Sequence, residues 1–163
     1  MQRAETLSTQ RAARSITAPG LLLGVGFGGL FDGVVLHQIL QWHHMLSDEP
    51  CCPMTTLRGL ELNTVADGLF HLVTIVALFA GTAMLFRRIR DEGVPWSGRQ
   101  LFGLGLKGWG LFNIVEGIVD HHILGLHHVR MGPDQLAYDI AFLVFGAILV
   151  VAGYLLARRT SSA

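Results

Sequence analysis

The chain has 163 residues, of which 51% are hydrophobic and only 15% are charged, with a formal net charge of +0 and a mean hydropathy of +0.47. This composition is typical of a small integral membrane protein with one domain. Because Lys and Arg only balance Asp and Glu, no excess of positive charge favours nucleic-acid binding.

Four hydrophobic stretches follow one another along the chain. Each is about 20 residues or longer, enough to cross a hydrocarbon core of ~30 Å. Only helices satisfy their own backbone hydrogen bonds in lipid at this length. We therefore expect an all-α transmembrane four-helix bundle between residues 19 and 158, rather than a soluble helical bundle. Its helices are predicted at about residues 21–42, 62–86, 101–126 and 136–157.

Arginines indicate how the bundle crosses the membrane. They gather before the first span, between the second and third spans, and after the fourth: Arg3, Arg11, Arg14, Arg87, Arg88, Arg90, Arg99, Arg158 and Arg159. By the positive-inside rule, both termini and the middle connection are cytoplasmic. Residues 1–18 are expected to form a flexible cytoplasmic arm and residues 159–163 a cytoplasmic tail.

The first and third spans carry one pattern twice. Residues 32–44 read DGVVLHQILQWHH and residues 116–128 read EGIVDHHILGLHH. The second and fourth spans match more weakly, through Ala66-Asp67 and Tyr138-Asp139. Because both halves have the same orientation, we predict a two-plus-two parallel internal repeat.

Ionisable side chains are costly inside a bilayer, so their repetition there predicts a functional site. On ideal helices the repeated acids and histidines fall on one side of their spans, at similar depths in the outer half of the bundle. Buried charges need a compensating cation, and His with Asp or Glu are ligands of transition metals. The predicted metal ligands are Asp32, His37, His43, His44, Asp67, His71, Glu116, Asp120, His121, His127, His128 and Asp139.

Within this set, an inner ring is the best candidate for direct coordination: Asp32, His37, Asp67, His71, Glu116 and His121. The outer histidines are predicted to be either a second site or an entry port: His43, His44, His127 and His128. This number exceeds the roughly four ligands of one zinc ion, so we expect two or more ions of copper, iron or zinc, or else one ion whose ligands are supported by many of these residues. Asn63, Asn113 and Tyr138 are candidates to support the ligands or to orient a substrate.

The two cysteines, Cys51 and Cys52, are adjacent in the first outer connection. A disulfide between neighbours is strained, so a stabilising one is not expected. They are interpreted either as small loop residues or as a soft-metal site with Met45 and Met54, which would favour copper.

Established metal signatures are absent: the Glu-x-x-His pairs of di-iron bundles and the His-Glu-x-x-His motif of zinc proteases. A haem held by His37 and His121 is a further alternative.

The segments GFGGLFDGVVLHQILQWHH, NTVADGLFH and GLFNIVEGIVDHHILGLHH resemble a family of predicted bacterial four-helix membrane proteins catalogued as a domain of unknown function. The resemblance covers nearly all of residues 20–157. It implies a location in the bacterial inner membrane, without an established activity.

The sequence therefore predicts an integral membrane metalloprotein with a multinuclear site for redox chemistry on a small or lipid-soluble substrate. Two other functions stay open. One is delivery of copper or zinc at the outer face, with a respiratory-chain or metal-assembly partner. The other is a proton or ion pathway through Asp32, Asp67 and Glu116. The lipid bilayer is the expected partner, and formation of a homo-oligomer is left open.

Overall fold

A computed structural model describes residues 15–158 as four long helices, with no strand in that range. The predicted all-α fold of four helices is confirmed. Most of the expected N-terminal arm and the whole C-terminal tail lie outside the described residues. The first helix begins at Thr17, two residues inside the range predicted for the arm.

Three of the four helices continue directly into a π-helical segment. Helix α2 (Thr17–Asp32) continues as η1 (Gly33–Ile39), α3 (Leu57–Phe86) as η2 (Arg87–Asp91), and α4 (Gly98–Glu116) as η3 (Gly117–Ile123). Helix α5 (Gln135–Ala157) has no such extension. The side chains of Thr56 and Ser97 accept the N–H groups of Gly59 at 3.1 Å and Gln100 at 3.2 Å. These caps start α3 and α4 earlier than predicted.

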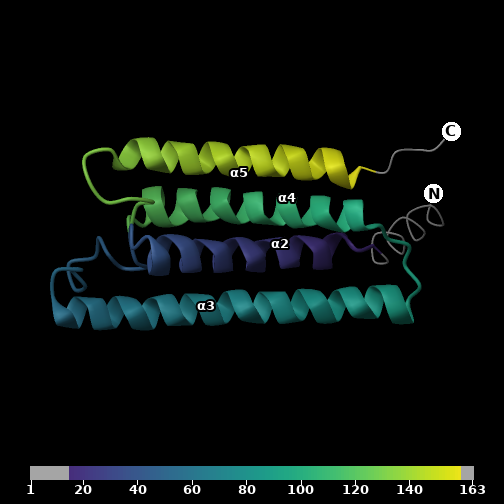
Figure 1. Cartoon of the computed structure of the whole chain (residues 1–163), viewed down its shortest axis with the longest axis horizontal. Helices are drawn as coiled ribbons and strands as arrows, with labels where there is room; N and C mark the ends of the chain where they lie inside the picture. Colours follow the sequence, from purple (N-terminus) through teal and green to yellow (C-terminus); the bar gives the residue numbers. More distant parts are fainter. Residues whose placement is uncertain (1–14, 159–163) are drawn as a thin grey trace, which may run out of the picture.

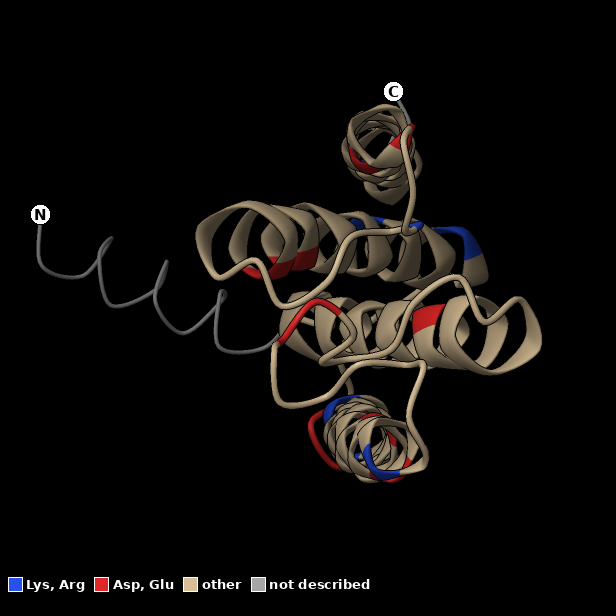
Figure 2. Cartoon of the chain, turned by 90° about the vertical axis from the view of Figure 1, so that its left-hand side faces the viewer, with Lys and Arg blue, Asp and Glu red and all other residues tan. Residues whose placement is uncertain are grey.

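The two helices that carry the repeated pattern lie in the middle of the molecule. Helices α2 and α4 pack against each other, while α3 packs on α2 and α5 packs on α4. The view along the bundle places α3 and α5 on opposite sides of this central pair (Figure 2). The connections that follow η1 and η3 lie at the same end of the molecule (Figure 1). Both repeated motifs are thereby brought to one end of the central pair.

Glycine permits the close approach of α2 to α4. A Cβ atom added at Gly108 would lie 2.9 Å from the Cα of Gly24, and one at Gly24 would lie 2.8 Å from the Cα of Gly108. Gly110 and Gly146 make a similar approach between α4 and α5. Small residues at helix interfaces allow backbone-to-backbone packing where lipid offers no hydrophobic drive for association.

We expect Gly108→Ala to destabilise the bundle by about 1–3 kcal/mol, because the added methyl group forces α2 away from α4. Gly105→Ala is the matched control, since a Cβ at that position meets nothing within 4 Å. Thermal unfolding in detergent, followed by circular dichroism, measures the difference. Equal unfolding midpoints for the two variants would contradict the close-packing argument.

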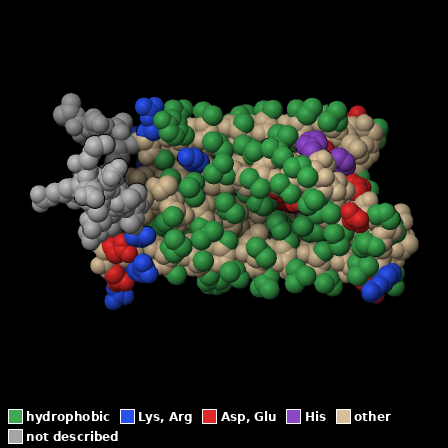
Figure 3. Space-filling model, turned by 180° about the vertical axis from the view of Figure 1, so that it is seen from behind, with side chains coloured by type: hydrophobic (Ala, Val, Ile, Leu, Met, Phe, Trp, Pro, Cys, Tyr) green, Lys and Arg blue, Asp and Glu red, His purple; other side chains and the backbone are tan. Residues whose placement is uncertain are grey.

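The outer faces of the bundle are apolar, as expected for contact with lipid. Large exposed side chains line α3 and α5, among them Leu69, Val73, Phe79, Val144 and Ile148. Figure 3 shows hydrophobic side chains over the middle of the molecule, with most Lys and Arg at the end where α3 leads into α4. A bilayer is the environment that such a surface fits.

Within residues 15–158, three helices are long and apolar enough to cross a membrane: Thr17–Ile39, Leu57–Asp91 and Gln135–Ala157. The sequence predicted four apolar spans, but α4 with η3 is not apolar enough to be counted as one of them. This helix carries Lys107, Glu116 and Asp120 within its length. Its central position, between α2 and α5, removes much of its surface from contact with lipid.

Candidate metal centre

The π-helical segments η1 and η3 end in matching turns. Gln41 has a φ of 51° and Gly125 has a φ of 63°, and each lies two residues after its π-helix. A positive φ stops a right-handed helix, and it is uncommon for a residue other than glycine. The chain therefore leaves the helical path before the His-His pairs. The ideal-helix placement of His43 and His127 on the faces of long helices was wrong for this reason.

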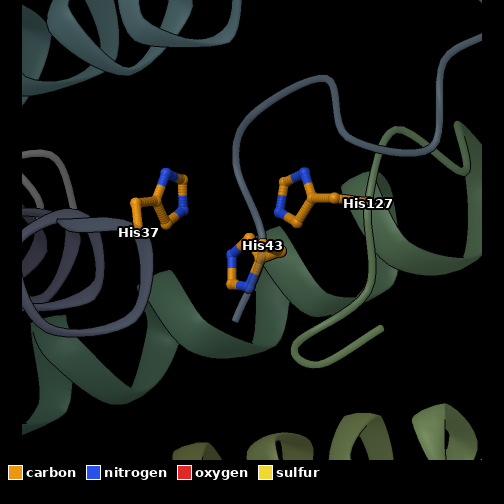
Figure 4. A group of neighbouring side chains, drawn as sticks. All are labelled: His37, His43 and His127. Carbon is orange, nitrogen blue, oxygen red and sulfur yellow. The ribbon is translucent and has the colours of Figure 1, made fainter. Parts of the chain in front are cut away.

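After these turns, His43 and His127 point back into the bundle. They join Asp32 and His37 of the first half, and Glu116 and His121 of the second. All these side chains are at most 7% exposed, and His37 and His127 are 0% exposed. Figure 4 shows the imidazole rings of His37, His43 and His127 gathered around one small space. We call this set the six-residue centre: Asp32, His37, His43, Glu116, His121 and His127.

Each carboxylate of the centre lies beside one or two histidines of its own half of the chain. Nε2 of His37 is 3.1 Å from Oδ2 of Asp32. Oε1 of Glu116 is 3.0 Å from Nε2 of both His121 and His127. The rings of His43 and His127 stack between the two halves, with centroids 4.5 Å apart and an interplanar angle of 4°. Donor atoms of two overlapping groups lie within 4.8 Å of one another: His37, His43, His127 and Glu116, His121, His127.

Two of the imidazoles are oriented by carboxylates on the flanking helices. Nδ1 of His37 is 2.9 Å from Oδ1 of Asp67 on α3, and Nδ1 of His121 is 3.2 Å from Oδ1 of Asp139 on α5. The same carboxylates accept from Nδ1 of His44 at 2.5 Å and of His128 at 2.6 Å. Asp67 and Asp139 were predicted as metal ligands. They instead contact the Nδ1 atoms of His37 and His121, on the side of each imidazole that faces away from the carboxylates of the centre. Carboxylates in this position commonly fix the orientation of metal-binding histidines.

The other two imidazoles are oriented by backbone carbonyls of the opposite half. Nδ1 of His43 is 2.8 Å from the carbonyl oxygen of Val129, and Nδ1 of His127 is 3.2 Å from that of Met45. A carbonyl oxygen only accepts, so each Nδ1 donates a proton to it, and Nε2 of His43, which has no hydrogen-bond partner among the described residues, is free to offer a lone pair. These contacts cross between the halves in matching fashion, since each carbonyl belongs to the residue two positions after the other half's histidine.

Several buried polar atoms of the centre have no hydrogen-bond partner among residues 15–158. They are Oδ1 of Asp32, Nε2 of His43 and Oε2 of Glu116. Buried polar atoms are normally satisfied, so a cluster of such atoms calls for an explanation. Burial and the neighbouring rings of His127 and His37 hold the pKa of His43 well below its usual range. His43 is therefore neutral at physiological pH and can offer its lone pair.

The remaining candidates lie around the centre. His71 lies against Gly33, with its Nε2 buried and without a hydrogen bond. Asp120 is half-buried beside Glu116 in a groove on the other side of α4. Asn63 holds the outer loop instead of a substrate: its amide donates to the carbonyl of Cys52 at 2.8 Å and accepts from the N–H of Leu46 at 2.9 Å.

Two further candidates lie on the α5 side of the centre. The Tyr138 hydroxyl accepts from Arg130, and its ring packs against Trp42. The Oδ1 atom of Asn113 is buried and has no partner. Asn113 and Tyr138 line one cavity, which also reaches Asp32.

Cys51 and Cys52 are joined by a disulfide, contrary to the expectation from their adjacency. A disulfide has no thiolate to offer a metal, so a soft-metal site with Met45 and Met54 would require its reduction. Met45 contributes its backbone instead, through the carbonyl that accepts from His127 and an N–H that donates to Asp67 at 3.0 Å.

Sequence reasoning missed the backbone carbonyls of Met45 and Val129. Their side chains carry no sign of this role, because any residue offers the same carbonyl. One signal was available: both residues directly follow the His-His pair of a repeated pattern. Matching backbone positions in a repeat are candidates for matching contacts even where the side chains differ.

A buried group of four histidines and two carboxylates, enclosed by helices with apolar outer faces, defines the class: a helical membrane protein with a candidate metal centre. The chain belongs to the family of predicted membrane proteins named DUF2243, a domain of unknown function, which matches residues 19–160. The family resemblance seen in the sequence is thus confirmed. No curated protein and no solved structure matches the chain.

Proposed function

We propose that this protein is an integral membrane metalloprotein whose six-residue centre holds transition-metal ions as a resident cofactor for redox chemistry. One observation carries the proposal. Four imidazoles have their Nδ1 atoms beside fixed acceptors, and they share a small buried space with two carboxylates whose side-chain partners among the described residues are histidines, without Lys or Arg. Neutral imidazoles do not balance two buried negative charges, whereas a divalent cation does.

The donor atoms narrow the choice of metal. The six-residue centre offers four imidazole nitrogens and two carboxylates, and it includes no sulfur. Such a mixed set suits iron, zinc or copper(II), while copper(I) prefers thiolate and thioether ligands. The orienting acceptors behind the histidines match the arrangement that stabilises metal-bound imidazoles.

The arrangement by halves favours two ions over one. By half of the chain, Asp32, His37 and His43 form one set of candidate ligands, and Glu116, His121 and His127 form a second. The donor atoms of the second set lie within 4.8 Å of one another, whereas in the first half the close group is His37 and His43 with His127. Three protein ligands leave coordination positions open, which is the common arrangement of catalytic sites. His127 also lies within reach of the first set, so the two positions are close together.

Burial favours a resident cofactor over metal delivery. A delivery site has to exchange its ion with a partner, whereas His37 and His127 are 0% exposed. The family resemblance implies a bacterial inner membrane, and the distribution of arginine supports a cytoplasmic location for both termini. The centre then lies in the outer half of the bundle, near the periplasmic surface.

Elemental analysis of protein purified in mild detergent, combined with absorption and electron paramagnetic resonance spectra, tests the proposal. We expect one to two equivalents of iron, copper or zinc per chain, with a redox-active metal if the site performs electron transfer. Less than about a tenth of an equivalent, both as purified and after incubation with each ion, would refute a metal centre. Such a result would favour the proton pathway through Asp32, Asp67 and Glu116. A haem absorption band would favour the bis-histidine alternative.

A further inference from the structure

A cavity of about 220 Å³ lies between α2, α4 and α5, directly beside the six-residue centre. Its walls are mainly aromatic: Phe31, Trp42, Trp109, Tyr138, Phe142 and Phe145. Phe31 and Phe145 are 42% and 43% exposed on the apolar outer surface, so the cavity opens towards lipid. A molecule dissolved in the bilayer can therefore enter it without crossing water.

Among the described residues that line the wall, Asp32 and Tyr138 are the ionisable ones, and Asp32 lies there with the amide of Asn113. These two side chains are 4% and 2% exposed. Oδ1 of Asn113 and Oδ1 of Asp32 are buried and have no hydrogen-bond partner within the described chain, while Oδ2 of Asp32 lies 3.1 Å from Nε2 of His37. An occupant that satisfies them has to donate hydrogen bonds, because carboxylate oxygens only accept. A lipid acyl chain has no such donor.

We propose that this cavity binds the hydroxylated aromatic head of a lipid-soluble hydroquinone. The aromatic walls stack on a flat ring, the ring hydroxyls donate to Asp32 and Asn113, and the tail leaves towards the bilayer between Phe31 and Phe145. The inference rests on the proposed function in one respect: Asp32 also lies beside His37, so the head would lie next to the metal centre. The oxidised quinone has no hydroxyl donor and should bind more weakly.

A second groove on the other side of α4 provides the comparison. It reaches Glu116 and Asp120 and is lined by Val25, Phe70, Leu111, Phe112, Val115 and Val119. Only two of these wall residues are aromatic, and Asp120 is half-exposed to the surroundings. The first cavity therefore has the walls that suit an aromatic ring, and the second groove serves as a control surface.

Tryptophan fluorescence can follow binding, because the chain has three tryptophans and two of them, Trp42 and Trp109, line the cavity. Trp96 lies at the opposite end of the bundle, and Trp96→Phe removes its background signal. This variant, in nanodiscs and without oxygen, is titrated with a decyl-substituted hydroquinone and with the dimethyl ether of the same compound. We expect saturable quenching by the hydroquinone, and binding of the ether at least ~10-fold weaker because its hydroxyl donors are lost.

Asn113→Leu, which keeps the branched shape of the side chain and removes the acceptor, should weaken hydroquinone binding about 10-fold. Phe112→Leu, in the second groove, should leave it unchanged. Equal binding of the hydroquinone and its ether would overturn the proposal and assign the cavity to acyl chains. This comparison uses the same protein for both ligands, so it holds even if Asn113→Leu fails to fold.

Metal content measured on the same samples separates this inference from the proposed function. Loss of hydroquinone binding in Asn113→Leu with unchanged metal content supports the cavity as a distinct binding site. Selective hydroquinone binding by a protein that takes up no metal would support the cavity and refute the metal centre. Normal metal content without selective binding would refute the cavity alone.

Discussion

Replacing His127 by Ala is expected to lower metal affinity by more than about 100-fold, since loss of an orienting partner alone typically costs 10–100-fold. His127 is the residue common to both groups of clustered donor atoms. Its Nε2 is 3.0 Å from Glu116, and its ring stacks on His43. Its removal therefore disturbs both halves of the six-residue centre. Metal stoichiometry and a competition titration against a chelator of known affinity measure the effect.

His122→Ala is the matched control for this substitution. His122 lies in η3 next to His121, but its side chain is exposed. It should keep the stoichiometry and affinity of the unaltered protein. Circular dichroism shows whether each variant keeps its helices. Full metal affinity in a folded His127→Ala protein would place the metal elsewhere and contradict the proposed centre.

The second large effect is expected for Asp67→Asn, which should weaken metal binding about 10–100-fold without removing any proposed ligand. Asp67 accepts from Nδ1 of His37, Nδ1 of His44 and the N–H of Met45. An amide of the same size turns one acceptor into a donor, so at least one of these three groups loses its partner. We also expect a loss of about 1–3 kcal/mol in stability, because that group stays buried.

Asp139→Asn should behave in the same way, because Asp139 makes the equivalent contacts with His121, His128 and Val129. Asp48→Asn, in the exposed part of the outer loop, is the control. Metal affinity is compared among the variants after correction for the folded fraction. A loss of stability with unchanged affinity would show that Asp67 holds the loop and does not tune the centre.

Much of the fold could be predicted because hydrophobic length is a local property of the chain. Four helices and the places of Asp32, His37, Glu116 and His121 within them follow from runs of apolar residues and the polar exceptions among them. The matching of residues 32–44 with 116–128 also needs only the sequence. The prediction of two metal ions and the predicted membrane orientation still await measurement.

The composition of the candidate centre depended on tertiary structure. The helical path stops at Ile39 and Ile123, so His43 and His127 fold back instead of extending the helix faces. Their orienting carbonyls come from residues 86 and 82 positions away. The pattern of residues within one span cannot predict a contact between distant parts of the chain. A backbone carbonyl is also the same in every residue, so the sequence gives no sign of which carbonyl will accept the hydrogen bond.

By itself the sequence determined the class of the protein and most of the residues that carry its polar interior, because apolar length and the cost of buried charge act at each position. Only the tertiary structure decided which of those residues face one another. It placed Asp67 and Asp139 behind the histidines, drew His43 and His127 inward, and opened an aromatic cavity onto Asp32. These outcomes depend on where helices end and on how closely glycine lets them approach, and both are properties of the packed bundle.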